Sequence, residues 1–513
     1  MLARLQSFLL QGIDALACEV EVDLNEFATN DKRDTIVGLP DAGVKEALER
    51  VRSAVVNSGY AAPSGRLLIN LAPADIRKEG PVYDLPIAVG MLITQGIIPA
   101  APRLDSEAPD HRKLFFAGEL ALDGRVRPIK GVIALASLAK LKGARGVIVP
   151  ADNAEEAAVV EGLEVFGVRT LSEVVGILRG ELEASPAPTP DVSGLLRAAA
   201  VAVDFADVRG QEAVKRAITV AAAGSHNLLM LGPAGTGKTM MAKALPGVLP
   251  PLTPEEAIEI TRIYSAAGQL APGQGLITTR PVRSPHHTAS PPAIVGGGII
   301  PRPGEISLAH RGVLFLDELP EFPRIVLETL RQPLEDHVVT IARSHSAVRF
   351  PASFMMVAAM NPTPKGDMPA GEVGKRAMDR YLERLSGPLL DRIDIHVEAP
   401  AVPWKELSRA PVGTSSTQMR DHVHAARQRQ IARQGPTTPN SRLSGKQLDT
   451  LAPFDDAARS LLGQAMGELG LSARAYDKIR RVSRTIADLE QSDAIHSHHV
   501  GEAVAYRLLD RKL

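Results

Sequence analysis

The stretch from residue 232 to residue 239 constrains this chain more than any other, because its residue order suits one local structure, a phosphate-binding loop. It reads Gly232, Pro233, Ala234, Gly235, Thr236, Gly237, Lys238, Thr239. The apolar run 228–231 before it predicts a strand, and residues 240–245 after it predict a helix. The glycines let backbone N–H groups turn toward phosphates, Lys238 adds a charge, and the Thr239 hydroxyl can hold Mg²⁺. A nucleoside triphosphate is the expected ligand.

A second apolar run, residues 313–316, ends in Asp317 and Glu318. A metal-holding carboxylate and a water-activating carboxylate are both expected at the C-terminal edge of a parallel sheet. Taken singly, a glycine-rich loop can be an ordinary turn, and a buried strand often ends in acids. Found together, the two segments predict hydrolysis of the nucleotide, with Thr239 and Asp317 as Mg²⁺ ligands and Glu318 as a catalytic carboxylate.

The composition fits a large enzyme whose overall charge creates no strong electrostatic field. The chain has 513 residues, 45% apolar content, a net charge of −1 and a single cysteine, Cys18. Any contact with a polyanion must therefore come from local loops. One cysteine excludes an intramolecular disulfide, and no apolar run reaches membrane-spanning length, so we expect a cytoplasmic protein without a membrane partner.

A proline-rich region and a second, loose region divide the chain into three parts, two of them α/β and the last helical. We expect a domain at 1–180, a linker at 181–200, an ATPase core at 201–407, a loose connector at 408–443 and a helical lid at 444–513. Periodicity in the first domain predicts strands at 18–24, 67–71, 114–122 and 146–149, and helices at 44–55, 84–94, 132–141 and 154–161.

The first domain resembles the proteolytic domain of Lon proteases. Residues 116–131 carry the resemblance, which extends from about residue 37 to residue 178. That family uses a Ser-Lys dyad. Its two positions are held here by Val82 and Ile133, and Lys130 lies in the wrong register. We therefore expect no peptidase activity.

From residue 37 to its end, the chain resembles the ComM/YifB family of magnesium-chelatase-like AAA+ ATPases. The motifs that carry the resemblance lie at 283–288, 296–298, 301–310, 330–335, 359–362, 386–394 and 484–489. The resemblance implies a Lon-like α/β domain, an AAA+ core with a parallel sheet, a small helical lid, ATP and Mg²⁺ as cofactors, and a homo-oligomeric, hexameric ring. Relatives commonly carry cysteines suited to zinc after the Asn-Pro pair, but residues 361–369 contain none, so we expect no zinc.

The resemblance also implies three further site residues. Asn361 matches the sensor-1 position, where an amide orients the attacking water, although an Asn before Pro can simply form a turn. Arg392 matches the arginine finger that stabilises charge in a neighbouring subunit's site, with a plain ion pair to Asp391 or Asp394 as the alternative. Arg474 matches sensor 2, with a surface arginine as its alternative.

DNA contacts are expected at a hairpin. Residues 338–350 form two alternating runs around a tip that holds Arg343 and His345, which could grip backbone phosphates without reading bases. An ordinary exposed hairpin turn is the alternative. His286 and His287 belong to a second motif loop and receive no role.

Two groups in the lid are expected to be solvated. These are the histidines His496, His498 and His499 and the basic run Lys478, Arg480, Arg481 and Arg484. The function that the resemblance implies is an ATP-driven DNA translocase or branch-migration helicase, acting on forked or branched DNA in recombination or natural transformation. The alternative is an AAA+ remodelling ATPase that acts on a protein or serves as a magnesium-chelatase-type motor.

Overall fold

The described residues form two compact units. The computed structural model of this chain describes residues 1–25, 34–101, 108–199, 203–298, 301–342, 347–363, 378, 380–403, 413–507 and 509. The first unit comprises Met1–Arg197 and Pro254–Thr278, and the second comprises Ala198–Thr253 and Thr279–Leu513. Residues 254–278 thus pack with the first unit, although their place in the sequence put them in the expected ATPase core.

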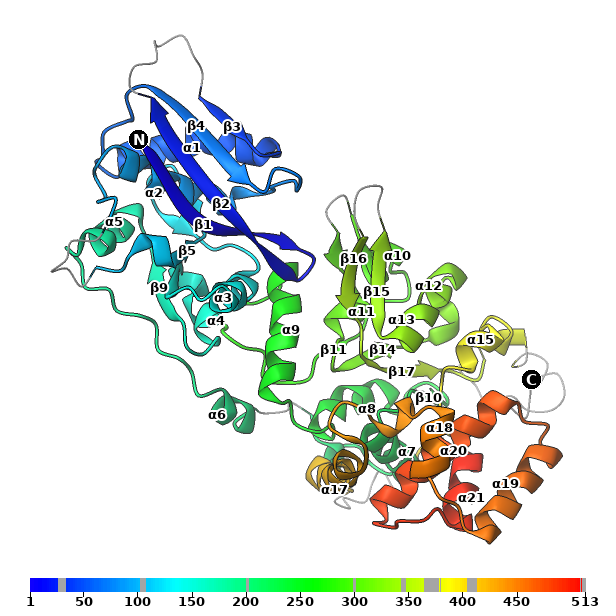
Figure 1. The fold of residues 1–513 in the computed structure, drawn as a ribbon. Helices are drawn as coiled ribbons and strands as arrows, with labels where there is room; N and C mark the ends of the chain where they lie inside the picture. The colour runs from blue at the N-terminus through cyan, green and yellow to red at the C-terminus, as the bar shows by residue number, and fades with distance from the viewer. Residues whose placement is uncertain are drawn as a thin grey trace. The chain divides into compact units, whose positions relative to one another are not determined.

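The first unit is an α/β domain built on one mixed sheet (Figure 1). Its strands, in spatial order, are β3 (Thr35–Val37), β4 (Arg66–Ala72), β2 (Asp14–Asn25), β1 (Leu2–Gln11), β5 (Leu114–Phe116), β8 (Gly146–Pro150) and β9 (Glu164–Val168). β2 pairs antiparallel with β1 and β4, whereas β5, β8 and β9 run parallel to one another. In β2 the buried side chains alternate with half-buried ones, which confirms the strand expected at 18–24.

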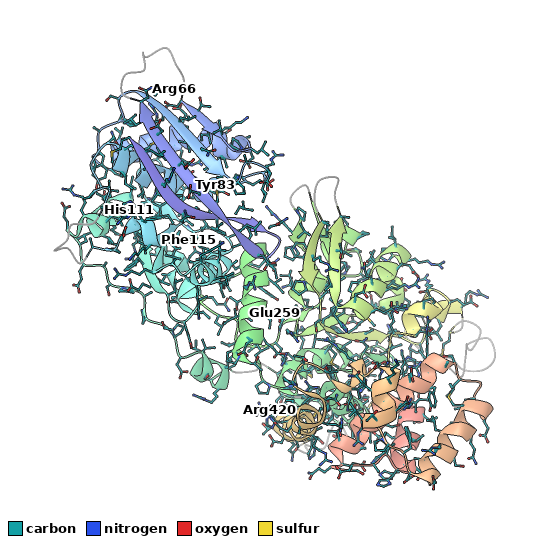
Figure 2. All side chains as sticks on the ribbon, in the orientation of Figure 1. Arg66, Tyr83, His111, Phe115, Glu259 and Arg420 are labelled. Carbon is teal, nitrogen blue, oxygen red and sulfur yellow. The ribbon has the colours of Figure 1, made fainter. Side chains whose placement is uncertain are left out.

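Helices cover this sheet, and all but the last of them lie where the 3.6-residue period predicted a helix. They are α1 (Ala42–Asn57), α2 (Asp84–Thr94), α3 (Val132–Leu141), α4 (Ala154–Ala158) and α5 (Leu171–Arg179). α1 begins after Asp41, whose carboxylate accepts a hydrogen bond from the Val44 N–H at 2.7 Å. Tyr83 and Phe115, labelled in Figure 2, are both buried in the cores of this unit.

The two positions aligned with the Lon dyad lie in apolar surroundings. Val82 is half-buried, and Ile133 on α3 is fully buried with its backbone N–H donated to Glu156. Lys130 is exposed, as a solvated loop lysine should be. Neither aligned position offers a nucleophile or a base.

Helix α9 (Pro254–Ala267), which follows the phosphate-loop region in sequence, is held in the first unit by a buried polar cluster. The Ser265 hydroxyl accepts a hydrogen bond from the Gly131 N–H at 2.9 Å and donates to the Glu156 carboxylate. Asn153 also donates to this carboxylate, at 3.2 Å. Burial raises the pKa of Glu156, and the hydrogen bond from Ser265 opposes this shift most strongly. The cluster fixes α9 against the start of α3.

We expect Ser265→Ala to lower the free energy of unfolding of the first unit by about 1–3 kcal/mol, because it leaves the buried Gly131 N–H without its acceptor. Urea unfolding followed by circular dichroism measures this loss. The control is Ser137→Ala, since the Ser137 hydroxyl only donates to the Ile133 carbonyl one turn earlier on its own helix. Equal stability of the wild type and Ser265→Ala would contradict the role given to this cluster.

The second unit contains a parallel sheet within its described residues. Its strands, in spatial order, are β11 (Val282–Arg283), β14 (Val313–Leu316), β17 (Met355–Met360), β10 (Leu228–Leu231) and β18 (Ile395–Glu398). All four neighbouring pairs are parallel. The helices α7 (Glu212–Gly224) and α8 (Lys238–Ala244) flank β10 in sequence. This architecture confirms the expected α/β core.

Both units also contain shorter elements. They are α6 (Val192–Arg197) in the first unit, and α10 (Pro291–Val295), β12 (Gly296–Gly297), β13 (Arg302–Pro303), α11 (Glu305–Leu308), α12 (Arg324–Thr329), α13 (Arg331–Asp336) and α15 (Gly387–Leu390) in the second. The expected hairpin forms from β15 (Val338–Ala342) and β16 (Ala347–Pro351), which pair antiparallel. Its tip residues Arg343 and His345 lie outside the described residues.

The C-terminal part is helical, as expected. It contains α17 (Ser416–Gln434), α18 (Gly445–Leu451), α19 (Asp456–Glu468), α20 (Ala473–Leu489) and α21 (Ser497–Ala505). α17 corrects the expectation of a loose connector, because Ser415 and Gln418 form a capping box that starts a helix there. None of the described helices is both long and apolar enough to span a bilayer.

The basic face of α20 is a second correction. Lys478, Arg480 and Arg484 are buried rather than solvated. Lys478 donates to the Ile393 carbonyl at 2.9 Å, and Arg484 binds the buried Asp488 at 3.0 Å. A buried cation needs such partners. Lys478 attaches the lid helix to the segment before β18, whereas Arg484 is satisfied by Asp488 on its own helix. Neither side chain offers a solvated cation to nucleic acid.

Candidate functional site

Three strand ends meet at one edge of the parallel sheet. Gly232 follows β10, Asp317 follows β14 and Asn361 follows β17. β17 lies between the other two strands, with Leu231 in register with Met360 and Leu316 in register with Ala358. Because all three strands are parallel, their carboxyl ends share an edge, which is where open α/β sheets bind ligands.

The glycines of the phosphate loop are required for different local reasons. A Cβ on Gly232 would lie 2.1 Å from the Ala399 carbonyl oxygen, so this position must be small to let the loop pass the end of β18. Gly235 and Gly237 have φ values of +81° and +86°, which other residues adopt only with strain, and a Cβ on either would meet no atom within 4 Å. The space around them is therefore open to a ligand.

Lys238 lies at the centre of this edge. Its Nζ donates to the carbonyls of Gly232 at 2.7 Å and Pro233 at 2.8 Å, and to Oδ1 of Asn361 at 3.2 Å. Burial lowers the pKa of Lys238, and the Asp317 carboxylate opposes this shift. The structure thus brings the expected sensor amide into direct contact with the loop lysine.

Thr239 and Asp317 form the pair expected to hold Mg²⁺. The Thr239 hydroxyl donates to Oδ2 of Asp317 at 2.7 Å. A hydroxyl and a carboxylate are oxygen ligands of the kind that Mg²⁺ takes together with nucleotide phosphates. The donor set therefore fits the expected cofactors, ATP with Mg²⁺.

Glu318 is held in an unusual backbone conformation beside this pair. Its φ is +52°, a left-handed value that is uncommon for a residue other than glycine. Its N–H donates to Oδ1 of Asp317 at 3.0 Å, and its own Oε2 lies 3.4 Å from Nδ1 of His287. Nothing in the sequence indicates the contact with His287, because the two residues lie on separate loops.

Arg392 does not make either of the ion pairs weighed from the sequence. Its guanidinium donates to the Pro388 carbonyl at 2.6 Å and pairs with Glu335 from α13. Its side chain is 12% exposed, whereas that of Glu335 is 60% exposed. A finger that reaches another subunit must release this pair.

Arg474, the expected sensor 2, binds Asp391 at 3.0 Å with its side chain 70% exposed. Among the described residues, no contact joins it to the phosphate loop. The geometry therefore brings together Lys238, Thr239, Asp317, Glu318 and Asn361, and leaves the two arginines with local partners.

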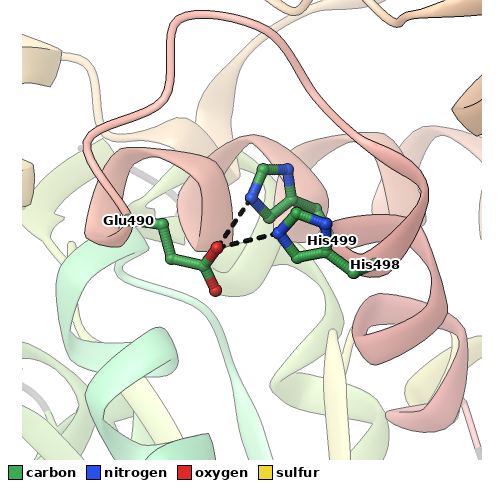
Figure 3. Close-up of side chains that lie close together, drawn as sticks. All are labelled: Glu490, His498 and His499. Atoms are coloured by element: carbon green, nitrogen blue, oxygen red, sulfur yellow. Dashed lines mark hydrogen bonds and ion pairs between the residues drawn. The ribbon is translucent and has the colours of Figure 1, made fainter.

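Glu490, His498 and His499 form a cluster in the lid that could suit a metal by proximity alone (Figure 3). Nδ1 of His499 accepts the His496 N–H at 2.9 Å, so the ring carries its proton on Nε2, which donates to Glu490 at 3.1 Å. A metal on Nε2 would move that proton to Nδ1, against the backbone N–H. Burial lowers the pKa of His499, which keeps it neutral in this cap. His499 is buried, contrary to the expected solvated face.

Three segments of the chain match families of magnesium chelatase subunits. Residues 20–153 match the family described as subunit ChlI of Mg-chelatase, residues 204–407 match magnesium chelatase, subunit ChlI, and residues 413–507 match its C-terminal part. The chain is similar to competence protein ComM of Haemophilus influenzae, at 44% identity over 98% of this chain and 96% of the relative. It is equally similar, with the same coverage, to the uncharacterized protein YifB of Escherichia coli. The magnesium-chelatase 38 kDa subunit of Rhodobacter capsulatus is 24% identical over 60% of this chain.

Proposed function

The chain belongs to the ComM/YifB family of magnesium-chelatase-like AAA+ proteins, and we propose that it is a ring-forming ATPase that uses ATP hydrolysis to move along forked or branched DNA. Membership of this family indicates ATPase activity. The observation that carries the proposal is the convergence of Lys238, Thr239, Asp317, Glu318 and Asn361 at one sheet edge.

Each of these side chains has a separate task in this proposal. Lys238 binds phosphate oxygens, while Thr239 and Asp317 hold Mg²⁺, which neutralises phosphate charge when bound. Glu318 takes a proton from the attacking water. Asn361, in contact with Lys238, orients that water from the end of the neighbouring strand β17.

The hairpin β15–β16 supports the choice of DNA as the substrate. One of its faces is buried through Val339, Ile341, Val348 and Phe350. Arg349 lies on the other, exposed face, so the hairpin projects a cation beyond the core. The expected tip of the hairpin adds Arg343 and His345. Since the net charge of the chain is −1, such a local feature is what a phosphate backbone would meet. A relative named as a competence protein also supports a role with DNA.

We expect four-way or forked DNA to raise the ATPase rate severalfold over the rate without DNA, and linear duplex of the same length to raise it less. The stimulation should fall as salt rises from 50 to 200 mM, because phosphate contacts release counterions. A coupled ATPase assay at fixed ATP measures both effects. Arg343→Ala should lose most of the stimulation, and Lys140→Ala, an exposed residue of the first unit, is the control.

The match to magnesium chelatase favours one alternative, a motor that serves a protein or tetrapyrrole-metal partner. The DNA proposal is wrong if the protein hydrolyses ATP but no DNA structure changes the rate at any salt concentration. That result would leave this alternative.

A further inference from the structure

His287 lies in a loop that the sheet itself directs toward Glu318. β11 ends at Arg283 and runs parallel to β14, so the chain leaves both strands at the same edge. The Arg283 guanidinium donates two hydrogen bonds of 2.6 Å to Glu305, which fixes the start of the loop. His287, four residues after Arg283, lies beside Glu318.

The ring of His287 is fixed on two sides. Its ring centroid lies 4.1 Å from that of His286 and 6.4 Å from that of the buried Phe322, which it meets edge-on. Its Nδ1 is 3.4 Å from Oε2 of Glu318. For that contact to attract, Nδ1 must carry a proton and donate to the carboxylate.

The neighbouring His286 is engaged elsewhere. Its Nδ1 lies 2.8 Å from the Thr288 hydroxyl and accepts the Thr288 N–H at 3.3 Å. It therefore closes the turn, whereas His287 faces the carboxylate. The two histidines offer a matched pair of positions: His287 lies 3.4 Å from Glu318, and His286 is hydrogen-bonded within the loop.

We propose that His287 is a positioning residue for hydrolysis: by donating Nδ1–H to Oε2 of Glu318 it holds this carboxylate so that its other oxygen faces the attacking water. The inference rests on the ATPase part of the proposed function and not on DNA. The pair is partly open to solvent, with the His287 side chain 32% exposed and that of Glu318 50% exposed. A pair of this kind contributes little to stability, so its effect should fall on turnover.

The test measures kcat and the KM for ATP separately in the full-length protein. We expect His287→Ala to lower kcat by about 10- to 100-fold, the usual cost of a misplaced catalytic group, with KM changed by less than about twofold. His287→Asn should recover most of kcat, because its amide can donate from nearly the same place as Nδ1. His286→Ala should stay within about twofold of the wild type.

Two results would overturn the proposal. One is an unchanged or raised kcat in His287→Ala. The other is an equal loss in His287→Ala, His287→Asn and His286→Ala, which would indicate loop damage. A double-mutant cycle with Glu318→Asp adds a second reading, since two groups that act through one contact lose less together than the sum of their single losses. A wild-type protein that hydrolyses no ATP would instead refute the proposed function.

Discussion

Lys238→Ala is expected to abolish tight ATP binding, whereas Glu318→Gln is expected to retain binding and lose hydrolysis. Lys238 is a buried cation that binds the phosphates in the proposed site, so its loss is expected to remove binding energy directly. Glu318 stands at the edge of the site, and its amide analogue keeps the size of the side chain while losing the ability to accept a proton. General-base catalysis is worth about 10² to 10⁴ in rate, which sets the expected loss in kcat.

Fluorescent-nucleotide titration measures binding, and phosphate release measures turnover. Lys243→Ala is the matched control for Lys238→Ala, because Lys243 belongs to the same helix α8 but is exposed. It should bind and hydrolyse ATP as the wild type does. A Glu318→Gln protein with wild-type turnover would remove Glu318 from its catalytic role, and tight ATP binding by Lys238→Ala would do the same for the loop lysine.

The core of this site was predictable because its signals are local. A run of apolar residues predicts a buried strand, and the residues that follow it, such as Asp317 or Asn361, are then placed by the strand's end. Parallel pairing brings those ends together without further information. Helices α1 to α4 of the first unit were predictable for the same reason, since the 3.6-residue period belongs to each segment by itself.

Contacts between distant segments were not predictable. Ser265 meets Glu156 across 109 residues, and nothing in the pattern of α9 indicates that it packs with the first unit rather than with the sheet that surrounds it in sequence. The basic residues of α20 resemble a solvated face in the sequence, because nothing there shows that Lys478 meets the Ile393 carbonyl of a distant segment. The pairing of Arg392 with Glu335 joins residues 57 apart and was missed likewise.

An equal mixture of Arg392→Ala and Lys238→Ala subunits is expected to regain the hydrolysis that each variant lacks alone. In the proposed ring, Arg392 serves a neighbour's site, so one subunit supplies an intact nucleotide site and the other an intact finger. With random mixing, an Arg392→Ala subunit receives the finger of a Lys238→Ala neighbour at about a quarter of the interfaces. An arginine finger is worth about 10³ or more in turnover, so even this fraction stands far above either parent.

The ion pair with Glu335 makes this experiment sharper, because Arg392 must leave it to reach across an interface. Glu335→Gln removes the charge that retains Arg392 and should therefore keep or raise turnover if Arg392 acts in trans. If the pair is structural instead, Glu335→Gln should lower stability without raising turnover. A mixture that is verified to co-assemble and still stays as inactive as its parents would show that Arg392 is either structural or acts within its own subunit, where Glu335 and the Pro388 carbonyl already hold it.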